Sequence, residues 1–287
     1  MNPVLDTYIK TQHVYVTKAD GMKELFDVSK LQNSLRRAGA NANFVEDILE
    51  NIEEDLVEGV TTHEIYHKAF ELLKTSEQPI ALRYSLKRAI MELGPSGFPF
   101  EDYVAAIFKH KGYETLTGQE VRGQYVSHEI DVVAWTDEKL VMVEAKFHNQ
   151  PGVKSDLKIA LYVKERFDDL SEVTFDYGLK GRKLDEGWLV TNTKFTSTAI
   201  EYGSHAGNRL IMVGWNYPEH GNLHDMILEA KLHPLTCLVS LNGMQKKNLL
   251  DKGIVLCKTL HENIALLDSL SLSKDEVDKV LQEIDEL

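Results

Sequence analysis

A cluster of chain-breaking residues, Leu-Gly-Pro-Ser-Gly at positions 93–97, separates two stretches of different character. Proline removes a backbone donor and fixes φ, and glycine tolerates conformations that helices and strands exclude, so no regular element is expected to cross this cluster. With 287 residues and 43% hydrophobic content, the chain on both sides can bury a core. We therefore predict two domains over residues 12–92 and 95–220, followed by a mostly helical region over residues 221–287.

The first stretch begins with two short extended runs, at residues 13–18 and 22–26, on either side of Asp20-Gly21. An Asp-Gly dipeptide in this setting is typical of a tight hairpin turn. Thr61 and Glu64 have the spacing of a helix capping box. Apolar residues recur at helical spacing in four segments, which are residues 29–37, residues 44–57, a segment starting near Thr61, and residues 79–92. The sequence therefore predicts a small hairpin followed by helices.

The second stretch alternates between helical and extended patterns. It begins with an amphipathic helix over residues 100–111, which has Phe100, Val104, Ile107 and Phe108 on one face. The elements expected next are strands 130–135 and 140–145, helix 155–170, strand 188–191, helix 197–204 and strand 210–215. This alternation favours a central sheet covered by helices, so the fold class is α/β, or α+β for the whole chain.

Charge and cysteine content exclude several classes of protein. A formal net charge of −13 argues against a general nucleic-acid coat protein, because nonspecific binding to a duplex depends on lysines and arginines. Cys237 and Cys257 form no CxxC pair, so neither a disulfide framework nor a structural zinc site is expected. The sequence has no stretch approaching the roughly 20 apolar residues that cross a bilayer and no apolar block of a signal peptide at its start. We therefore expect a cytoplasmic protein with no membrane partner.

Three charged residues stand where two apolar runs meet polar sequence. Asp131 lies in the first run, and Glu144-Ala-Lys146 ends the second. Residues i and i+2 of a strand share a face, so Glu144 and Lys146 are expected to project together, and Asp131 on the neighbouring strand can meet Glu144. Two carboxylates and the backbone carbonyl of Ala145 form a set of hard oxygen ligands for Mg²⁺ or Mn²⁺. Lys146 would position an attacking water or stabilise a charged transition state.

Glu101, in the first turn of the preceding helix, is a fourth candidate for the same site. The helix dipole alone would also favour a glutamate there. Likewise, Glu144 and Lys146 could be a surface ion pair on an edge strand. Lys154 and Lys158 could contact phosphate, although lysines on a solvated helix face are common.

These residues resemble the PD-(D/E)XK nuclease superfamily and, within it, the Mrr-type restriction endonucleases. The order of the motifs matches that family across residues 95–217. The resemblance implies a restriction endonuclease-like fold and metal-dependent cleavage of DNA. Many Mrr-type relatives carry glutamine where this chain has Glu144, and a glutamate keeps a full metal ligand. The supporting motifs are Phe100-Glu101-Asp-Tyr, Gly112-Tyr113, Asp131-Val-Val-Ala, Glu144-Ala-Lys146, Leu189-Val-Thr-Asn192 with Phe195 and Ala199, and Gly214-Trp215.

The first stretch resembles an ATP-cone domain across residues 12–92. The matching motifs are Val14-Tyr-Val-Thr-Lys18-Ala-Asp20-Gly21, Glu24-Leu-Phe-Asp27-Val-Ser-Lys30-Leu31, Thr61-Thr62-His-Glu-Ile65 and Tyr84-Ser-Leu-Lys87-Arg88. The resemblance implies binding of ATP or dATP as an allosteric signal without hydrolysis, and the sequence has no GxxxxGK[ST] P-loop. The positions that it implies are Val16 and Lys18 on the hairpin, Glu24 and Asp27 for base or sugar contacts, Lys30 for phosphate, and Thr62 and Lys87 as further members. A packing or dimerisation module that has lost its ligand is the alternative.

The two resemblances together predict a nucleotide-regulated, divalent-metal-dependent DNA endonuclease of restriction or genome-defence type. Paired cuts in duplex DNA need two active sites, so a homodimer or larger assembly is expected. The first alternative is a nucleotide-responsive DNA-binding regulator that keeps the nuclease fold without cutting. The second is a structural or signalling protein that uses both domains for assembly, which the acidic net charge favours.

Overall fold

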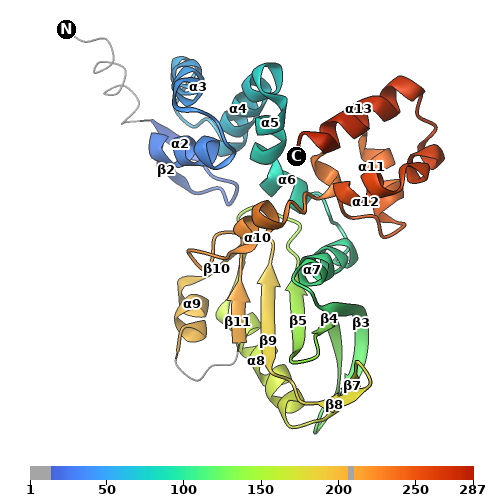
Figure 1. Ribbon diagram of the computed structural model, residues 1–287. Helices are drawn as coiled ribbons and strands as arrows, with labels where there is room; N and C mark the ends of the chain where they lie inside the picture. The colour runs from blue at the N-terminus through green and yellow to red at the C-terminus, as the bar shows by residue number, and fades with distance from the viewer. Residues whose placement is uncertain (1–13, 206–209) are drawn as a thin grey trace.

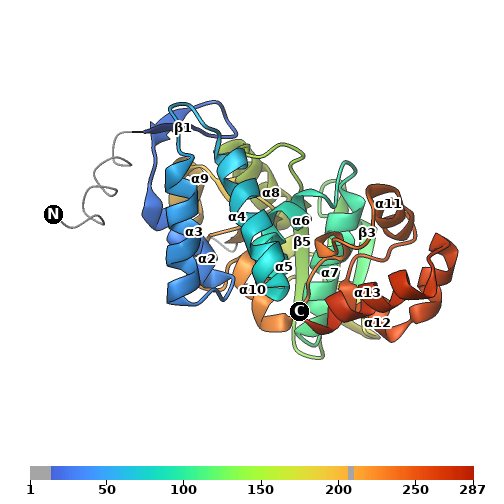
Figure 2. The same cartoon turned by 90° about the horizontal axis from the view of Figure 1, so that it is seen from above.

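The computed structural model describes residues 14–205 and 210–287. The N-terminal hairpin and helices lie above a central sheet, and the C-terminal helices lie beside them (Figure 1). The view from above shows the hairpin and the helix α13 on opposite sides of the molecule (Figure 2). This arrangement confirms the α/β class expected from the sequence.

The N-terminal part is a two-stranded antiparallel hairpin followed by helices. The strands are β1 (Tyr15–Thr17) and β2 (Lys23–Leu25), and His13, where the first extended run was expected to begin, lies outside the described residues. The helices are α2 (Val28–Arg37), α3 (Ala42–Glu54) and α4 (Thr62–Ser76). The capping box of α4 is confirmed, because the Thr61 side chain accepts from the backbone of Glu64 while the Glu64 carboxylate accepts from the backbone of Thr61.

The single helix expected over residues 79–92 is wrong, since the chain forms α5 (Gln78–Tyr84) and α6 (Leu86–Met91). The hydroxyl of Ser85, between them, donates to the carbonyl of Leu82 at 2.8 Å. Tyr84 packs in the core of the N-terminal part. Leu86 instead packs in the core that the helix Phe98–His110 shares with the central sheet. The chain changes direction because consecutive residues serve two different cores.

The central sheet has five strands in the order β11-β9-β5-β4-β3. The pairs β3–β4 and β4–β5 are antiparallel, and β5–β9 and β9–β11 are parallel. The edge strand β3 was not predicted from the sequence, because its side chains are mostly polar and are half-buried or exposed. The strands are β3 (Glu114–Arg122), β4 (Ser127–Trp135), β5 (Leu140–Lys146), β9 (Glu186–Thr191) and β11 (Leu210–Val213).

Helices cover both faces of this sheet. The apolar face of α7 (Phe98–His110) packs with Val132, Val143 and Ala145 on one side. On the other side, α8 (Leu157–Ser171) and α9 (Ser197–Gly203) pack with Met142 and the neighbouring strands. Apart from the edge strand β3, the strands of the sheet therefore send side chains into two separate cores, as expected for a sheet buried on both faces.

In residues 14–205 and 210–287, two short strand pairs besides the hairpin β1–β2 lie outside the central sheet. The parallel pair is β6 (Lys154–Ser155) and β10 (Lys194–Phe195), so Lys154 lies on a strand and not on the following helix as expected from the sequence. The antiparallel pair is β7 (Phe175–Tyr177) and β8 (Lys180–Arg182).

The C-terminal part is helical, as expected, and has a core of its own. Cys237 and Cys257 are buried free thiols. Within residues 14–205 and 210–287, no helix combines the length and the apolar character that crossing a membrane requires. The elements are α10 (Leu223–Ala230), η1 (Leu235–Cys237), α11 (Gly243–Leu250), α12 (Cys257–Glu262), η2 (Ile264–Leu270) and α13 (Lys274–Asp285).

Candidate active site

The candidate site forms where β4 and β5 leave the apolar core. Leu140 to Val143 are buried, and then Glu144 and Lys146 become half-buried on either side of buried Ala145. Val132 faces Val143 in the antiparallel register, which places Asp131 opposite Glu144 one residue further along. The Asp131 carboxylate accepts a hydrogen bond from the backbone N–H of Ala145, with 2.7 Å between Oδ2 and N. The structure therefore brings together the aspartate and the Glu-Ala-Lys motif.

An arginine that the sequence reading did not identify completes the site. The Arg166 guanidinium forms an ion pair with the Glu144 carboxylate, and it also donates to the carbonyl of Glu129 at 3.1 Å. The two side chains of the pair are only 12% and 17% exposed. Arg166 lies in α8 at helical spacing from Val163 and Leu170, which are both buried. A charged residue on the apolar face of a helix is the signal that could have identified it.

Two carboxyl groups of the site hold their protons more tightly than usual. Burial, followed by the nearby charge of Glu144, raises the pKa of Asp131 to about 6. Burial, followed by the charge of Asp131 and then by Asp102, Glu129 and Glu144, raises the pKa of Glu101 to about 7. Glu101, in the first turn of α7, is therefore close enough to the Asp131–Glu144 pair to interact with it, as its position in the sequence suggested.

The donor set fits a hard divalent cation in its chemistry. Asp131, Glu144 and the carbonyl of Ala145 offer oxygen ligands, and the mutual repulsion of the carboxylates would be relieved by added positive charge. At Glu144, the guanidinium of Arg166 supplies part of that charge. Within the part of the chain that the structure describes, no group of three or more His, Cys, Asp or Glu side chains is placed as a metal cluster. A cation here would therefore depend on two carboxylates and a backbone oxygen.

Lys146 projects from the same side of β5 as Glu144 and is half-buried. Its positive charge contributes to the lowered pKa of His148, after desolvation of that imidazole. Among the described residues, Lys146 forms no ion pair with a carboxylate. Its ammonium group can therefore act on a substrate or a water.

A cavity of about 480 Å³ adjoins the site on the side of α8. Arg166 belongs to both, and Tyr125 and Tyr162 on the cavity wall are 71% and 63% exposed. His128, also in the wall, lies 2.7 Å from the Asp169 carboxylate. Exposed aromatic rings beside a charged site are the kind of surface on which nucleic acid bases stack.

The hairpin and the start of α2 bring three of the residues implied by the ATP-cone resemblance together. Glu24 forms ion pairs with Lys18 at 2.7 Å and Lys30 at 3.2 Å. The Asp27 side chain caps α2 by accepting from the backbone and hydroxyl of Ser29, so it already has a structural role. Val16 is buried in the core of this part of the chain.

The other two implied residues lie on helices that follow. Thr62 is the first residue of α4, and a bridge between Thr17 and Thr61 holds this helix start beside β1. Lys87 lies on α6, away from the hairpin in the sequence. Its pKa is lowered by desolvation and then by the charges of Lys194 and Arg37.

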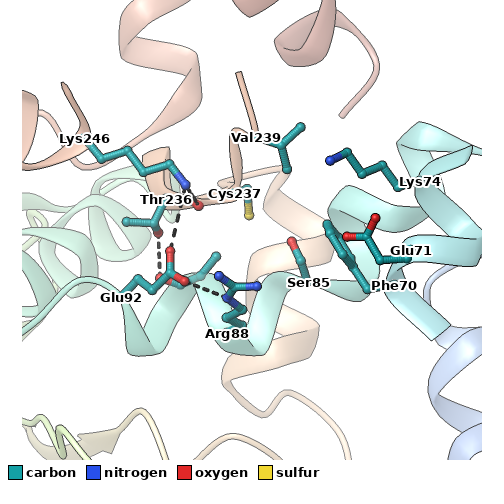
Figure 3. Close-up of a pocket in the computed structure, with 11 residues that line it drawn as sticks. Phe70, Glu71, Lys74, Ser85, Arg88, Glu92, Thr236, Cys237, Val239 and Lys246 are labelled. Atoms are coloured by element: carbon teal, nitrogen blue, oxygen red, sulfur yellow. Dashed lines mark hydrogen bonds and ion pairs between the residues drawn. The ribbon is translucent and has the colours of Figure 1, made fainter. Parts of the chain in front are cut away.

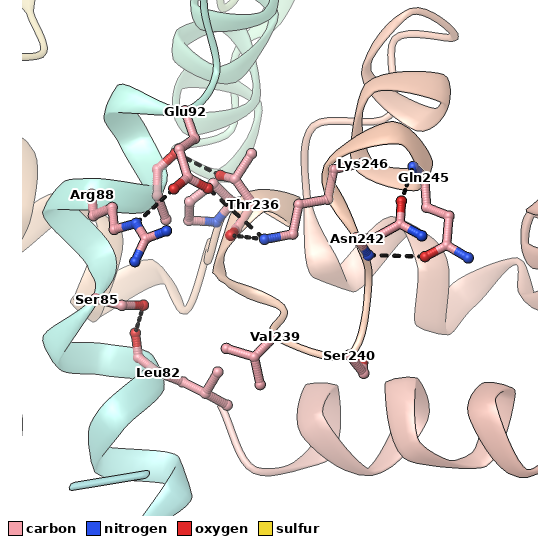
Figure 4. A network of polar contacts seen from close by, with 12 residues as sticks. Leu82, Ser85, Arg88, Glu92, Thr236, Val239, Ser240, Asn242, Gln245 and Lys246 are labelled. Atoms are coloured by element: carbon pink, nitrogen blue, oxygen red, sulfur yellow. Dashed lines mark hydrogen bonds and ion pairs between the residues drawn. The ribbon is translucent and has the colours of Figure 1, made fainter. Parts of the chain in front are cut away.

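A second cavity, of about 250 Å³, lies where α4 and α6 meet the C-terminal part (Figure 3). Arg88 and Lys246 in its wall both approach the Glu92 carboxylate, at 2.7 and 3.8 Å. Thr236 donates to the carbonyl of Ala89 at 2.6 Å, and Lys246 donates to the carbonyl of Thr236 (Figure 4). These charges are satisfied by one another, so the network ties the C-terminal part to α6.

The fold and this site are those of a restriction endonuclease-type α/β domain, which follows a module made of a hairpin and helices. The sequence matches the ATP cone domain family over residues 14–92, the restriction endonuclease family over residues 94–214, and the AF1548-like C-terminal family over residues 233–287. The resemblances to an ATP-cone domain and to a Mrr-type nuclease domain are thereby confirmed.

An uncharacterized protein of Archaeoglobus fulgidus is 36% identical over 156 residues, which are 54% of this chain and 82% of that protein. The crystal structure of the protein of unknown function AF1548 shares 31% identity with a TM-score of 0.53, over 67% of this chain and 97% of that one. The chain belongs to this AF1548-like family. A match to the MspJI restriction endonuclease in complex with a 27-mer oligonucleotide has 14% identity and a TM-score of 0.31, over 67% of this chain and 35% of that one, which is too low to establish a shared arrangement.

Proposed function

We propose that this protein is a nucleotide-regulated, divalent-metal-dependent DNA endonuclease of restriction or genome-defence type. The observation that carries the proposal is the meeting of Asp131, Glu144 and Lys146 at the end of β5, inside a domain of the restriction endonuclease family. Two carboxylates that could hold a divalent cation, with a lysine beside them, support phosphodiester hydrolysis at this site.

In the proposed mechanism, Asp131, Glu144 and the Ala145 carbonyl would hold a Mg²⁺ or Mn²⁺ ion. The bound ion would supply Lewis-acid polarisation of the scissile phosphate and lower the pKa of a coordinated water. The chain's own residues orient the reaction. The backbone N–H of Ala145 fixes the Asp131 carboxylate, and Arg166 fixes Glu144 from α8.

Lys146 and Glu101 have complementary roles in this proposal. The Lys146 ammonium group donates hydrogen bonds to the attacking water or to the oxygens of the phosphate as their charge grows. Glu101 has a pKa of about 7, so it can accept a proton from the nucleophile and release it again near neutral pH. The proposal therefore assigns a hydrogen-bond donor to the phosphate oxygens and a proton acceptor to the attacking water.

The substrate in this proposal is DNA, and the regulator is an adenine nucleotide. Because the chain carries a formal charge of −13, we expect DNA to bind through local cations and the bound ion, and not through overall attraction. ATP or dATP would bind at the hairpin and α2, where Lys18 and Lys30 approach Glu24. Nucleotide occupancy would change access to the site or assembly of a homodimer or larger oligomer.

The direct test is nicking of supercoiled plasmid with Mg²⁺ or Mn²⁺, with and without ATP and dATP. We expect Asp131→Ala to abolish nicking and Lys146→Ala to reduce its rate roughly 10²–10³-fold, as loss of a transition-state donor does. Asp137→Ala, in the exposed turn after β4, is the matched control and should cut normally. Equal nicking by Lys146→Ala and the wild type would remove the catalytic assignment.

A non-cutting, nucleotide-responsive DNA-binding regulator is the second candidate function. The ion pair that occupies the Glu144 carboxylate favours it, since a carboxylate committed to Arg166 is less available to a cation. Salt-sensitive retention of DNA without nicking under any of these conditions would support the regulator over the nuclease.

A further inference from the structure

Two lysines of the nuclease domain lie next to each other at its surface facing the hairpin. Lys154 and Lys194 are register partners in the parallel pair β6–β10. Like charges on paired strands repel each other. Figure 1 shows β10 directly below β2 and α2. Because both side chains are exposed, solvent screens part of the repulsion between Lys154 and Lys194, and a nearby anion would relieve the rest.

The turn of the hairpin packs against the loop that leads into β6. A Cβ atom added to Gly152 would lie 3.1 Å from the backbone nitrogen of Asp20, and Gly152 has φ +87°. Only a residue without a side chain fits this approach easily. The hairpin residues and the β6–β10 pair are therefore held close to each other.

Cations of the two domains repel one another electrostatically, and we call them the interdomain basic cluster. They are Lys154 and Lys194, which are register partners, Lys18 and Lys30, which share Glu24, and Arg37 and Lys87, whose charges join the same set of repulsions. Solvent reaches Lys194, yet surrounding atoms desolvate its ammonium group and lower its pKa, and the charges of Lys18, Lys154 and Lys30 lower it further. Glu24 offsets part of this repulsion through its ion pairs. Gathering these cations in a chain of net charge −13 points to an anionic ligand with several charges.

We propose that Lys154 and Lys194 of the nuclease domain complete the phosphate site that Lys18 and Lys30 begin, so that the triphosphate of an adenine nucleotide bridges the two domains. This inference rests on the proposed binding of ATP or dATP by the ATP-cone domain. Glu24 and the hairpin lie on one side of the triphosphate, and the β6–β10 pair lies on the other.

The bridge has a physical connection to the catalytic strand. Ser155, next to Lys154, donates to the Thr191 hydroxyl at 3.3 Å and lies 2.9 Å from the His148 imidazole. The side-chain amide of Asn192 accepts a hydrogen bond from the backbone N–H of His148 at 2.8 Å and donates one to its carbonyl at 3.0 Å. His148 follows Lys146 by two positions, so a movement of β6 and β10 toward bound phosphates would reach the end of β5 through these bonds.

The test is calorimetric titration of the full chain with ATP, AMP and adenosine. We expect Lys194→Gln to weaken ATP binding roughly 10–100-fold, as loss of a charged hydrogen bond does, and to leave adenosine binding unchanged. Lys194→Arg should keep most of the affinity because it keeps the charge. Lys109→Gln, at an exposed lysine of α7 outside the cluster, is the matched control. Circular dichroism establishes that each variant is folded.

The outcomes separate the two proposals. If the wild type binds ATP and the double variant Lys154→Gln, Lys194→Gln binds it equally well, the proposed bridge is wrong. Nucleotide binding by the ATP-cone domain would still stand. If the wild type binds no nucleotide, the regulatory half of the proposed function fails and the bridge fails with it. If the double variant loses affinity for a duplex oligonucleotide but not for ATP, the lysines serve DNA and the bridge is overturned.

Discussion

Neutralising Asp131 should stabilise the metal-free protein while it removes activity. Its pKa rises from 3.8 to about 6 on folding, and each unit corresponds to about 1.36 kcal/mol, so keeping it charged costs about 3 kcal/mol near neutral pH. Asp131 is half-buried, and solvent screening reduces this to about 2 kcal/mol. Asp131→Asn should therefore raise the free energy of unfolding by about 2 kcal/mol, since an amide oxygen can still accept from Ala145.

The sign of the pH dependence follows from the raised pKa. An acid that binds its proton more tightly in the folded state than in the unfolded state destabilises the fold as pH rises. The increase in the free energy of unfolding caused by Asp131→Asn should therefore be complete above about pH 6 and absent below about pH 4. Urea unfolding followed by tryptophan fluorescence measures it, because Trp135, Trp188 and Trp215 all lie in the nuclease domain or directly after it.

Chelator and magnesium arms complete this experiment. Millimolar Mg²⁺ should stabilise the wild type more than Asp131→Asn, because a ligand that binds the folded state adds its binding free energy. Asp137→Asn should unfold like the wild type with or without the ion. If Asp131→Asn is no more stable than the wild type in chelator near neutral pH, the reasoning about crowded carboxylates is refuted.

Three further predictions concern other charged groups. Arg166→Ala should lower the free energy of unfolding by about 3 kcal/mol by leaving the Glu144 charge unpaired, and adding Glu144→Gln should restore part of it in a double-mutant cycle. Burial lowers the pKa of His233 to about 4, so its contribution to the free energy of unfolding is fully present above about pH 6.5 and should fall by about 3 kcal/mol toward pH 4. His233→Asn cannot titrate at this position and should show a smaller fall in parallel urea titrations. The negative charge of phosphate beside Lys194 should raise the lowered pKa of this lysine, so ATP binding in alkaline solution should take up protons. Calorimetry in buffers of different ionisation enthalpy measures this uptake, and a binding enthalpy that is the same in all of them would contradict the prediction.

Elements with strong local patterns were predictable from the sequence. The helix α7 and the strand β5 are found nearly where their apolar periodicity placed them. The strand β3 was not, because it is an edge strand whose polar residues give no apolar alternation. The break at Ser85 depends on which core each neighbouring residue joins, and this information is not local.

Only part of the candidate site was predictable from the sequence, for the same reason. The spacing of Asp131 and Glu144 was visible because neighbouring strands carry both residues. Arg166 is 22 positions from Glu144 and reaches it only because α8 packs on that face of the sheet. The electrostatic effect of Lys18 on Lys194 depends on how the two domains dock, and no spacing within either motif indicates this.

The short helix α6 has a consequence for how the molecule can be divided. Leu86, Ala89 and Ile90 fill the same core as α7 and the central sheet, although the ATP cone family match extends to residue 92. Cutting the chain at that family border would remove three apolar side chains from the core of the restriction endonuclease-type domain and leave a cavity there. A stable fragment of the restriction endonuclease-type domain should begin before Ser85, because the last helix of the ATP-cone match is also a structural part of that domain.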